Sequence, residues 1–393
     1  MKEGWEIKKL VEVCEIVNGG TPDTKIKEFW DGDNLWITPK DMGKLNSIYV
    51  NDTERKITFE GLKNSSAKLL PENSVILSSR APIGHLAINN HPISTNQGCK
   101  GLIPKTDLNT LFLYYFLKNS VKLLNDLGSG TTFKELSGSK LGTIEIPLPP
   151  LPEQQRIVQL LDEAFEKIET LKANAEHNLQ NAKELFQSAL TEELKPKEGW
   201  EERKLNEITT VKDGTHDSPR YIENGIPFVT QKNIKQDGLT LSDTKFITET
   251  DHEKFYKRSD VTYGDILISM IGANRGMAAI VDDKRVFSIK NVGLIKASES
   301  INQNFLLFFL KSSIAMNYVL EMSNGGAQEF IGLTALRSFP IPLPTLPEQQ
   351  TIVEHLDALS ARCKTLETNY QKTIAQCDEM KKAVLAKAFN GEL

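Results

Sequence analysis

The residue types that could catalyse a reaction occur in this 393-residue sequence, but not at the spacings that catalysis requires. The chain contains no GxxxxGK[ST] loop of the kind that cradles ATP phosphates, and no Gly-rich fingerprint for a nucleotide cofactor. An Asn-Pro-Pro-aromatic tetrapeptide, which amino-methyltransferases use, is also missing, and the six histidines do not cluster with Ser or Cys. We therefore predict that the chain is not an enzyme and holds no cofactor itself.

Acidic and sulfur-bearing residues suggest two alternatives, a nuclease and a metal site. A nuclease could use Pro22-Asp23 or the run Asp282-Asp283-Lys284, but such short matches are frequent in a chain that is 25% charged. The cysteines form no CxxC pair, and no histidine lies at zinc-ligand spacing from them. We predict reduced thiols and no metal site. The cysteines are Cys14, Cys99, Cys363 and Cys377.

Charge and hydropathy limit the class of protein. The net charge of −5 argues against a protein that simply coats DNA, because such proteins are basic. The acidic excess lies in 152–195, with five Lys/Arg against nine Asp/Glu, and in 346–393, with six against seven. Any DNA-binding face on the remainder must therefore be a local patch. No apolar run approaches the ~18 residues of a membrane span, and MKEGWEIKKL lacks a signal-peptide core, so we expect a cytoplasmic protein.

The chain is an internal duplication. KEGWEIKKL at 2–10 recurs as KEGWEERKL 195 residues further along, and IPLPPLPEQQRIVQLLD at 146–162 recurs as IPLPTLPEQQTIVEHLD at the same offset. The interiors, 18–135 and 213–330, have diverged. This pattern favours one framework that carries two different recognition surfaces, although neutral drift in loops is an alternative.

Two long helices follow the two globular units, for which we predict an α+β fold. The expected divisions are 1–151 and 196–345 for the units, and 152–195 and 346–393 for the helices. Apolar residues at 4-3 spacing predict a coiled-coil seam. The predicted seam consists of Ile157, Leu161, Ala164, Ile168, Leu171, Ala175, Asn178, Ala182, Leu185 and Ala189, with Ile352, Leu356, Leu359, Cys363, Leu366, Tyr370, Thr373, Cys377, Met380 and Val384.

The direction of helix pairing follows from volume and connectivity. Antiparallel pairing sets the small residues Ala175, Ala182 and Ala189 against the bulky start of the second helix, which fills space evenly. Volume alone also permits parallel pairing. Because a whole globular unit lies between the helices, we predict an antiparallel pair with pseudo-twofold symmetry.

These features together resemble the specificity subunits of type I restriction-modification enzymes. The resemblance rests on the paired PLPxLPEQQ openings at 147–162 and 342–357, each leading into a long helix, and on the GWExxKL starts at 4–10 and 199–205. Smaller signals are NGGTP at 18–22, DGTHDSPRYIENGIPFVT at 213–230 and GDILISMIGANRGMAAIV at 264–281. The resemblance covers the whole chain.

The resemblance implies a division of labour. Each globular unit would be a target-recognition domain that reads one half of a split double-stranded DNA site. The helices would set the spacing between half-sites and dock two methyltransferase subunits, and restriction motor-nuclease subunits would complete the assembly for host defence. S-adenosylmethionine, ATP and Mg²⁺ would bind those partners, not this chain.

Candidate DNA contacts lie in polar loops punctuated by glycine. Arg and Lys suit guanine, while Asn and Gln suit adenine. Each could equally be a solvated loop residue, but the set as a whole favours DNA contact. The predicted residues are Lys25, Lys27, Lys40, Arg80, Asn96, Gln97, Thr131 and Lys134 in the first unit, and His216, Arg220, Gln231, Lys232, Asn233, Asn274, Arg275 and Gln328 in the second.

Two other functions compete with this interpretation. A scaffold whose coiled coil binds proteins would show no salt-dependent DNA affinity and would leave the diverged interiors unexplained. An enzyme of unrecognised type would need a pocket of perturbed acids or a metal cluster, which no spacing suggests.

Overall fold

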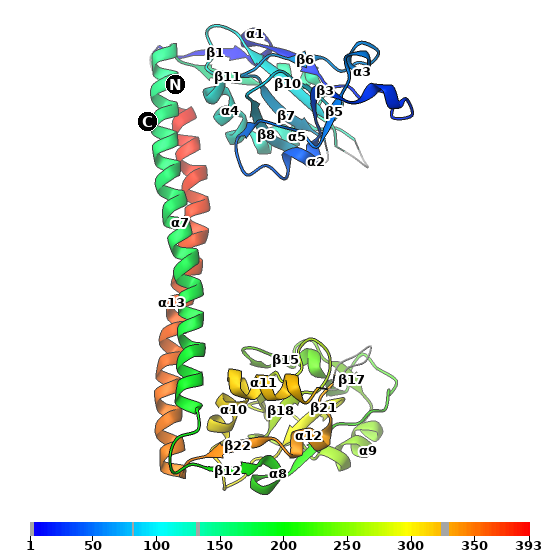
Figure 1. The fold of residues 1–393 in the computed structure, drawn as a ribbon, viewed down its shortest axis with the longest axis vertical. Coiled ribbons are helices and arrows are strands. Elements are labelled where there is room, and N and C mark those ends of the chain that lie inside the picture. The colour runs from blue at the N-terminus through cyan, green and yellow to red at the C-terminus, as the bar shows by residue number, and fades with distance from the viewer. Residues whose placement is uncertain (1–3, 81, 131–133, 324–329) are drawn as a thin grey trace. The chain divides into compact units, whose positions relative to one another are not determined.

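The computed structural model describes residues 4–80, 82–130, 134–323 and 330–393. Contacts divide the chain into two compact units (Figure 1). The first unit contains the residues up to Ala175 together with Lys372–Leu393, and the second contains Glu176–Gln371. Each unit therefore combines a globular α+β part with a portion of both long helices, α7 (Leu151–Leu194) and α13 (Leu346–Asn390).

The first globular part is built on a five-stranded sheet in the order β2-β10-β7-β8-β4. A second sheet, in the order β5-β3-β9-β6, pairs β3 with β9 in parallel, and β1 pairs with β11. The strands are β1 (Glu6–Lys9), β2 (Cys14–Asn18), β3 (Trp30–Ile37), β4 (Tyr49–Val50), β5 (Arg55–Ile57), β6 (Leu69–Leu70), β7 (Val75–Ser79), β8 (Ile83–Asn89), β9 (Ile93–Thr95), β10 (Cys99–Pro104) and β11 (Glu145–Leu148). The helices are α1 (Leu10–Val13), η1 (Lys27–Phe29), α2 (Pro39–Met42), α3 (Phe59–Lys63), α4 (Thr110–Asn119), α5 (Val121–Leu127) and α6 (Gly138–Gly142).

The second globular part repeats the centre of this topology, with β13-β21-β18-β19 following the order of β2-β10-β7-β8 and β17-β14-β20 that of β5-β3-β9, and it adds a β15-β16 pair. As β3 does in the first part, β14 pairs in parallel with one neighbour, β20, and antiparallel with the other, β17. The strands are β12 (Glu201–Lys204), β13 (Val211–Asp213), β14 (Ile226–Val229), β15 (Ile234–Lys235), β16 (Gly238–Leu239), β17 (Lys245–Ile247), β18 (Ile266–Ser269), β19 (Ala278–Ile280), β20 (Ser288–Ile289), β21 (Val292–Ile295) and β22 (Pro340–Leu343). The helices are α8 (Leu205–Ile208), η2 (Gln231–Asn233), α9 (Glu249–Ser259), α10 (Gln303–Lys311), α11 (Ser313–Glu321) and α12 (Leu333–Arg337). The predicted α+β class and tandem duplication are confirmed.

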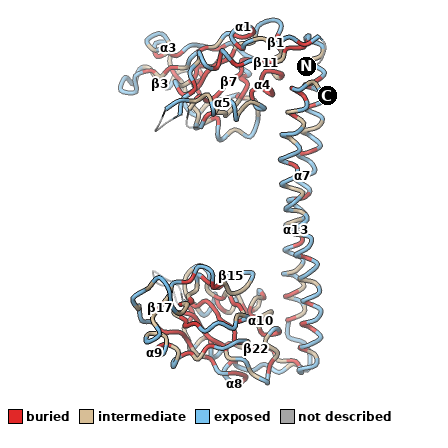
Figure 2. The backbone as a smooth tube through the Cα atoms, turned by 180° about the vertical axis from the view of Figure 1, so that it is seen from behind, coloured by how far each residue is buried: buried red, intermediate tan, exposed pale blue. Residues whose placement is uncertain are grey.

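Each globular part encloses its own apolar core, seen as the buried segments in Figure 2. In the first, β7 is buried along its whole length, and Phe112 on α4 is fully buried beside it. Asn109 caps α4 by accepting from the backbone amide of Phe112 at 3.0 Å. In the second, Asn302 caps α10 in the same way, and Phe305 fills the core. The cores hold the sheets rigidly, so the loops at the strand ends are positioned by the framework.

The repeated LPEQQ motif joins each globular part to its long helix. Gln154 is buried; its Oε1 accepts from Asn109 N at 2.8 Å, and its Nε2 donates to Asp107 O at 2.9 Å. Gln349 occupies the same position in the second unit, where its Oε1 accepts from Asn302 N at 2.8 Å. The first glutamine of each motif is therefore a buried tie between the helix start and the globular core.

The two long helices pair antiparallel within each unit, as predicted. In the first unit the start of α7 shares a core with the end of α13 through Leu161 and Phe389, and Lys172 Nζ lies 2.7 Å from Asp378 Oδ1. In the second, the end of α7 packs on the start of α13 through Leu190 and Leu356.

The seam between these helices differs from the predicted one along one of its two lines. The line through Leu161, Ile168, Ala175 and Ala182 is buried, as are Ile157, Ile352 and Leu356, while Leu359 and Tyr370 are partly buried. Leu171 and Leu366, however, are 45% and 40% exposed, and Leu185 and Met380 are exposed as well. The residues one position later, Lys172, Phe186, Glu367 and Lys381, are partly buried instead, and Phe165, Leu179, Ser360 and Ile374 continue the same line at heptad spacing.

Long charged side chains explain this correction. Lys172 pairs with Asp378, and Lys381 pairs with Glu169, so their stems lie along the seam while their charges reach a partner. A pattern that selects apolar residues assigns Lys172 and Lys381 to the surface and so breaks this line, although Phe165, Leu179, Phe186 and Ile374 on the same line are apolar. Cys363 and Cys377 are buried in the seam, and all four cysteines are free. No helix in the described part of the chain is long and apolar enough to cross a membrane.

Candidate nucleic-acid interface

A short capped turn follows β3 in the first unit and β14 in the second. Thr38 N donates to Asp41 Oδ2 at 2.9 Å, and Thr230 N donates to Asn233 Oδ1 at 2.9 Å. Both turns are capping boxes, in which the first and last side chains satisfy each other's backbone amides. Lys40 and Lys232, each the residue before the last of its box, are exposed at equivalent positions.

Asn233 itself does not match its predicted role. Its side chain is only 4% exposed, and its Oδ1 also accepts from Thr230 Oγ1 at 3.2 Å. We therefore correct the prediction that Asn233 contacts a base: it is a positioning residue that fixes the turn carrying Lys232. The polar loop composition gave no sign of this, because a cap and a base reader use the same amide group.

The loop after β9 completes a polar cluster in the first unit. Asn96 N donates to Ile37 O at 2.9 Å, which ties the loop to β3. Asn96 Nδ2 donates to Thr21 Oγ1 at 2.9 Å, and the Thr21 hydroxyl bonds to Gln97 Oε1. Gln97 is exposed while Asn96 is half-buried, so the cluster presents Gln97 outward and uses Asn96 to hold it.

Arg80 lies against this loop. A Cβ on Gly98 would come within 3.1 Å of Arg80 Nε and 3.0 Å of Pro39 Cγ, so this glycine lets the arginine, the loop and the Thr38–Asp41 turn approach one another. Arg80 NH1 lies 3.8 Å from Glu135 Oε2. The structure thus brings together Lys40, Arg80, Asn96 and Gln97 from distant parts of the sequence.

The other first-unit candidates lie elsewhere. Lys25 and Lys27 are exposed beside Asp23, next to a surface where Arg55 stacks on the Trp30 ring at 3.6 Å. Lys134 is exposed and precedes Glu135. Two predicted residues, Thr131 and Gln328, lie outside the described residues.

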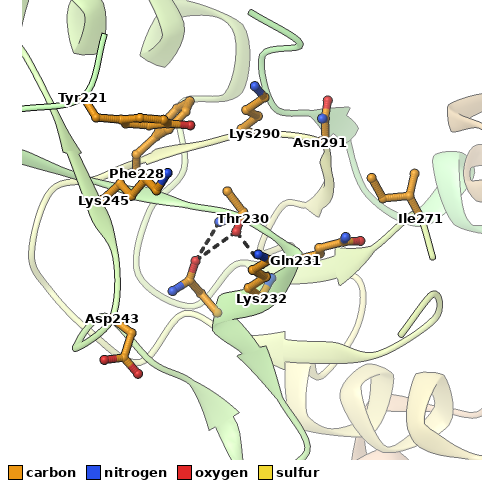
Figure 3. A pocket seen from close by; sticks show the side chains of 11 residues that line it. Tyr221, Phe228, Thr230, Gln231, Lys232, Asp243, Lys245, Ile271, Lys290 and Asn291 are labelled. Carbon is orange, nitrogen blue, oxygen red and sulfur yellow. Dashed lines mark hydrogen bonds between the residues drawn. The ribbon is translucent and has the colours of Figure 1, made fainter. Parts of the chain in front are cut away.

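The second unit has a cavity of about 280 Å³ at the corresponding place (Figure 3). Predicted residues Gln231, Lys232 and Asn233 line it, together with Asn291. His216 Nδ1 lies 2.7 Å from Asn291 Oδ1. On its other side, His216 Nε2 lies 3.1 Å from Asp213 Oδ2. His216 and Asn291 correspond to Thr21 and Gln97 in the first unit. His216 follows Thr215 as Thr21 follows Gly20, and the backbone amides of Thr215 and Gly20 make equivalent bonds to β20 and β9.

Two lysines of this cavity escaped the sequence prediction. Lys290 Nζ donates to Ser218 Oγ at 2.6 Å, and Lys245 Nζ lies 4.3 Å above the Tyr221 ring. Figure 3 shows both among the side chains that line the cavity. The 195-residue offset of the duplication maps Asn96 onto Asn291 and so misses Lys290, whose equivalence to Asn96 appears only in the fold: Lys290 N donates to Val229 O as Asn96 N donates to Ile37 O.

Arg220 and Asn274 are exposed, but Arg275 is engaged, with its Nε donating to Ser323 Oγ at 3.0 Å. Arg80 and Arg275 both follow a matching strand in the sequence, yet they are not equivalent in the fold. Arg275 precedes Gly276, whose positive φ matches that of Gly84 in the first unit. The counterpart of Arg80 is instead Ile271, which bridges to Phe330 as Arg80 bridges to Glu135.

The arrangement offers hydrogen-bond donors and positive charges on two equivalent surfaces. Among the residues that the structure describes, no group of His, Cys, Asp or Glu side chains is arranged to hold a metal ion. Lysine, histidine and amide groups at the ends of a rigid sheet are suited to base edges and phosphates. The fold and these surfaces define a duplicated recognition protein with two non-identical binding sites.

Comparison with known proteins identifies its family. The model for the type I restriction modification DNA specificity domain matches residues 2–179 and again 197–376. The type I restriction enzyme MjaIX specificity subunit of Methanocaldococcus jannaschii is 31% identical, over 99% of this chain and 93% of its own length. The chain therefore belongs to the family of type I restriction-modification specificity subunits, and the resemblance inferred from its motifs is confirmed.

Solved structures share the fold. A chain from a study of complex assembly and conformational transition of the type I R-M system matches with a TM-score of 0.78 at 21% identity, covering 100% of this chain and 99% of that one. The HsdS subunit from Thermoanaerobacter tengcongensis matches with a TM-score of 0.66 at 21% identity, over 100% of this chain and 98% of its own. The match over whole chains extends the shared fold to the long helices as well as the globular parts.

Proposed function

We propose that each globular part of this specificity subunit reads one half of a bipartite double-stranded DNA target. The observation that carries the proposal is one framework with two sets of side chains. Backbone bonds place Thr21 and Gln97 in the first unit as they place His216 and Asn291 in the second. Two different half-sites require different side chains at the same positions of a shared framework, because side chains distinguish the base edges.

In this proposal the long helices set the spacing and dock two methyltransferase subunits. Leu171, Leu185, Leu366 and Met380 support this role, because they are apolar, exposed and outside the seam between α7 and α13. They are the positions at which a protein partner could contact the helices without disturbing the seam. Restriction motor-nuclease subunits would join the same assembly.

The chemistry would belong to the partners. S-adenosylmethionine would bind the methyltransferase subunits, and ATP with Mg²⁺ would bind the motor-nuclease subunits. This chain would hold no cofactor and would act where the DNA is, in the cytoplasm. Alone it would bind DNA in a salt-dependent way, because neutralising phosphates with Lys and Arg releases counterions.

Methylation mapping tests the proposal. The chain is combined with its methyltransferase subunits, and methylated adenines are mapped by long-read sequencing. We expect one bipartite motif with a fixed spacer. Exchanging residues 213–330 for the interior of another family member should change one half-site and leave the other half-site and the spacer unchanged. A change in the spacer alone would contradict the proposal. The absence of any motif would contradict it too, and is the result expected of a chain that binds only proteins.

A further inference from the structure

Two bridged positions have the same place in both units but opposite chemistry. Arg80 directly follows β7 and bridges to Glu135, while Ile271 lies two residues after β18 and bridges to Phe330. The backbone agrees as well: Leu136 N donates to Ser79 O, and Ile331 N donates to Met270 O, each one residue along from the bridge. A charged pair in the first unit is therefore replaced by an apolar pair in the second.

A third position lies on the neighbouring strand. Lys100 on β10 pairs with Leu77, three residues before Arg80. Gly293 on β21 pairs with Ile268, three residues before Ile271. We call Arg80, Lys100 and Glu135 the charged triad, and Ile271, Gly293 and Phe330 its apolar counterpart. Of these six residues, only Arg80 was predicted from the sequence as a DNA contact.

Lys100 is the most unusual member of the triad. Its side chain is 6% exposed, yet within the described part of the chain its ammonium has neither a hydrogen-bond nor an ion-pair partner. It lines a cavity of about 580 Å³ together with Glu135, Asn18 and Ser137. Partial burial lowers the pKa of Lys100, because desolvation disfavours the charged form, while the nearby Glu135 carboxylate acts in the opposite direction. A lysine whose stem is buried and whose ammonium faces an open polar cavity beside Glu135, without a direct ion pair, is placed to donate to a ligand with acceptor atoms.

The triad as a whole suits a G·C base pair better than a phosphate. In the major groove a G·C pair presents the O6 and N7 acceptors of guanine beside the N4 donor of cytosine. Arg80 and Lys100 supply donors, and Glu135, whose carboxylate attracts both of them, supplies an acceptor. A phosphate has acceptors only, and the Glu135 carboxylate would repel it.

The apolar counterpart suits a different base. Ile271 lines the cavity of the second unit, and Phe330 is 44% exposed beside it. Neither side chain can donate or accept a hydrogen bond. The group in the major groove that prefers apolar contact is the C5-methyl of thymine.

We propose that the charged triad reads a G·C pair in the half-site of the first unit, and that Ile271 and Phe330 pack on a thymine methyl in the half-site of the second. This inference rests on the proposed function and adds the class of base pair at one position of each half-site.

The experiment uses the full chain in complex with its methyltransferase subunits. The wild-type motif is mapped first, and exchange of residues 18–135 identifies the half-site of the first unit. Each base pair of that half-site is then replaced in a duplex oligonucleotide, and binding is measured for wild type and for the triple variant Arg80→Ile, Lys100→Met, Glu135→Gln. In wild type, we expect replacement of one G·C pair by A·T to weaken binding by about 5- to 150-fold. The triple variant should lose this discrimination and keep the second half-site unchanged.

A matched control and two opposite outcomes make the test decisive. Lys122→Met removes an exposed lysine from α5 of the same unit and should leave discrimination intact. Methylation of an unchanged second half-site shows that the variant complex is assembled. The proposal is overturned if the triple variant still discriminates at every position. It is equally overturned if binding falls uniformly on all sequences with a smaller salt dependence, because that pattern marks a phosphate contact. Absence of any bipartite motif in wild type would instead refute the proposed function.

Discussion

The two globular parts differ in the side chains that their loops expose, but they share the backbone hydrogen bonds that hold those loops in place. The loop after β9 and the loop after β20 are anchored by the same bonds, from Asn96 N to Ile37 O and from Lys290 N to Val229 O. These bonds involve no side chain, so the residue at this position can change from an amide to an ammonium without loss of the loop geometry. The duplicated protein can therefore acquire two specificities while keeping one architecture.

The helix ends show the opposite behaviour. Gln154 and Gln349 bond to the core through their side chains, so substitution there would break the framework itself. This contrast explains why the LPEQQ motif is repeated almost unchanged, whereas the interiors 18–135 and 213–330 resemble each other only in outline. A hydrogen bond made by a side chain restricts which residue can occupy that position, whereas a bond between backbone groups allows the residue type to change.

The largest expected effect separates the helices from the globular parts. We predict that seven residues inserted into both α7 and α13, at matched places in the antiparallel pair, will change the spacer and leave both half-sites unchanged. One heptad restores the seam and adds about 10.5 Å, comparable to three base pairs at ~3.4 Å rise. Binding to the original spacing should fall by roughly 10²–10⁴-fold, because both units can no longer engage at once.

Methylation mapping reads the new spacer directly, and binding to the old target gives the loss. A four-residue insertion at the same places is the control, since it breaks the heptad and should impair folding as well as spacing. If the seven-residue insertion changed a base within a half-site, the separation of roles between helices and globular parts would be wrong.

A smaller effect is expected at the two buried glutamines. We predict that Gln154→Ala and Gln349→Ala each lower the free energy of unfolding by about 1–3 kcal/mol, because each removes a fully buried amide side chain and leaves a partly buried backbone amide without its acceptor. The neighbouring Gln155 is exposed, so Gln155→Ala should change stability by less than about 0.5 kcal/mol. Denaturant unfolding of the full chain measures all three. Equal stability of Gln154→Ala and Gln155→Ala would show that the tie contributes nothing.

How far the sequence could predict these features depends on the kind of signal. The duplication, the α+β units and the antiparallel helices followed from identical offsets and from heptads, which are long and redundant patterns. The seam was wrong at Leu171 and Leu366 because Lys172 and Glu367, one position later, bury their stems despite their charge. A hydrophobic pattern cannot register such residues.

The binding surfaces were predictable only in part, for a related reason. Lys40, Gln97, Gln231 and Lys232 were identified from residue type in polar loops, and the structure places them on the two surfaces. Asn233 has the same residue type but serves as a cap. Lys100 lies within a buried strand, where a sequence pattern gives no reason to look for a ligand-facing charge. Its importance appears only when its cavity and its counterpart Gly293 are compared.

The smallest expected effect tests that last comparison through stability. We predict that Lys100→Met raises the free energy of unfolding by up to roughly 1 kcal/mol near neutral pH, because it removes a partly desolvated charge that makes no direct ion pair. The lowered pKa means that the folded chain holds this proton less tightly than the unfolded chain does. Wild-type stability should therefore rise, relative to Lys100→Met, as the pH increases through the lowered pKa towards the ordinary lysine range. The difference between the two proteins is thus greatest near neutral pH and shrinks in alkali, which unfolding curves across that range would measure. Lys122→Met, at an exposed lysine, should show no such dependence. A Lys100→Met protein that is less stable than wild type at neutral pH would mean that the ammonium has a stabilising partner, and the case for a ligand at this cavity would fail.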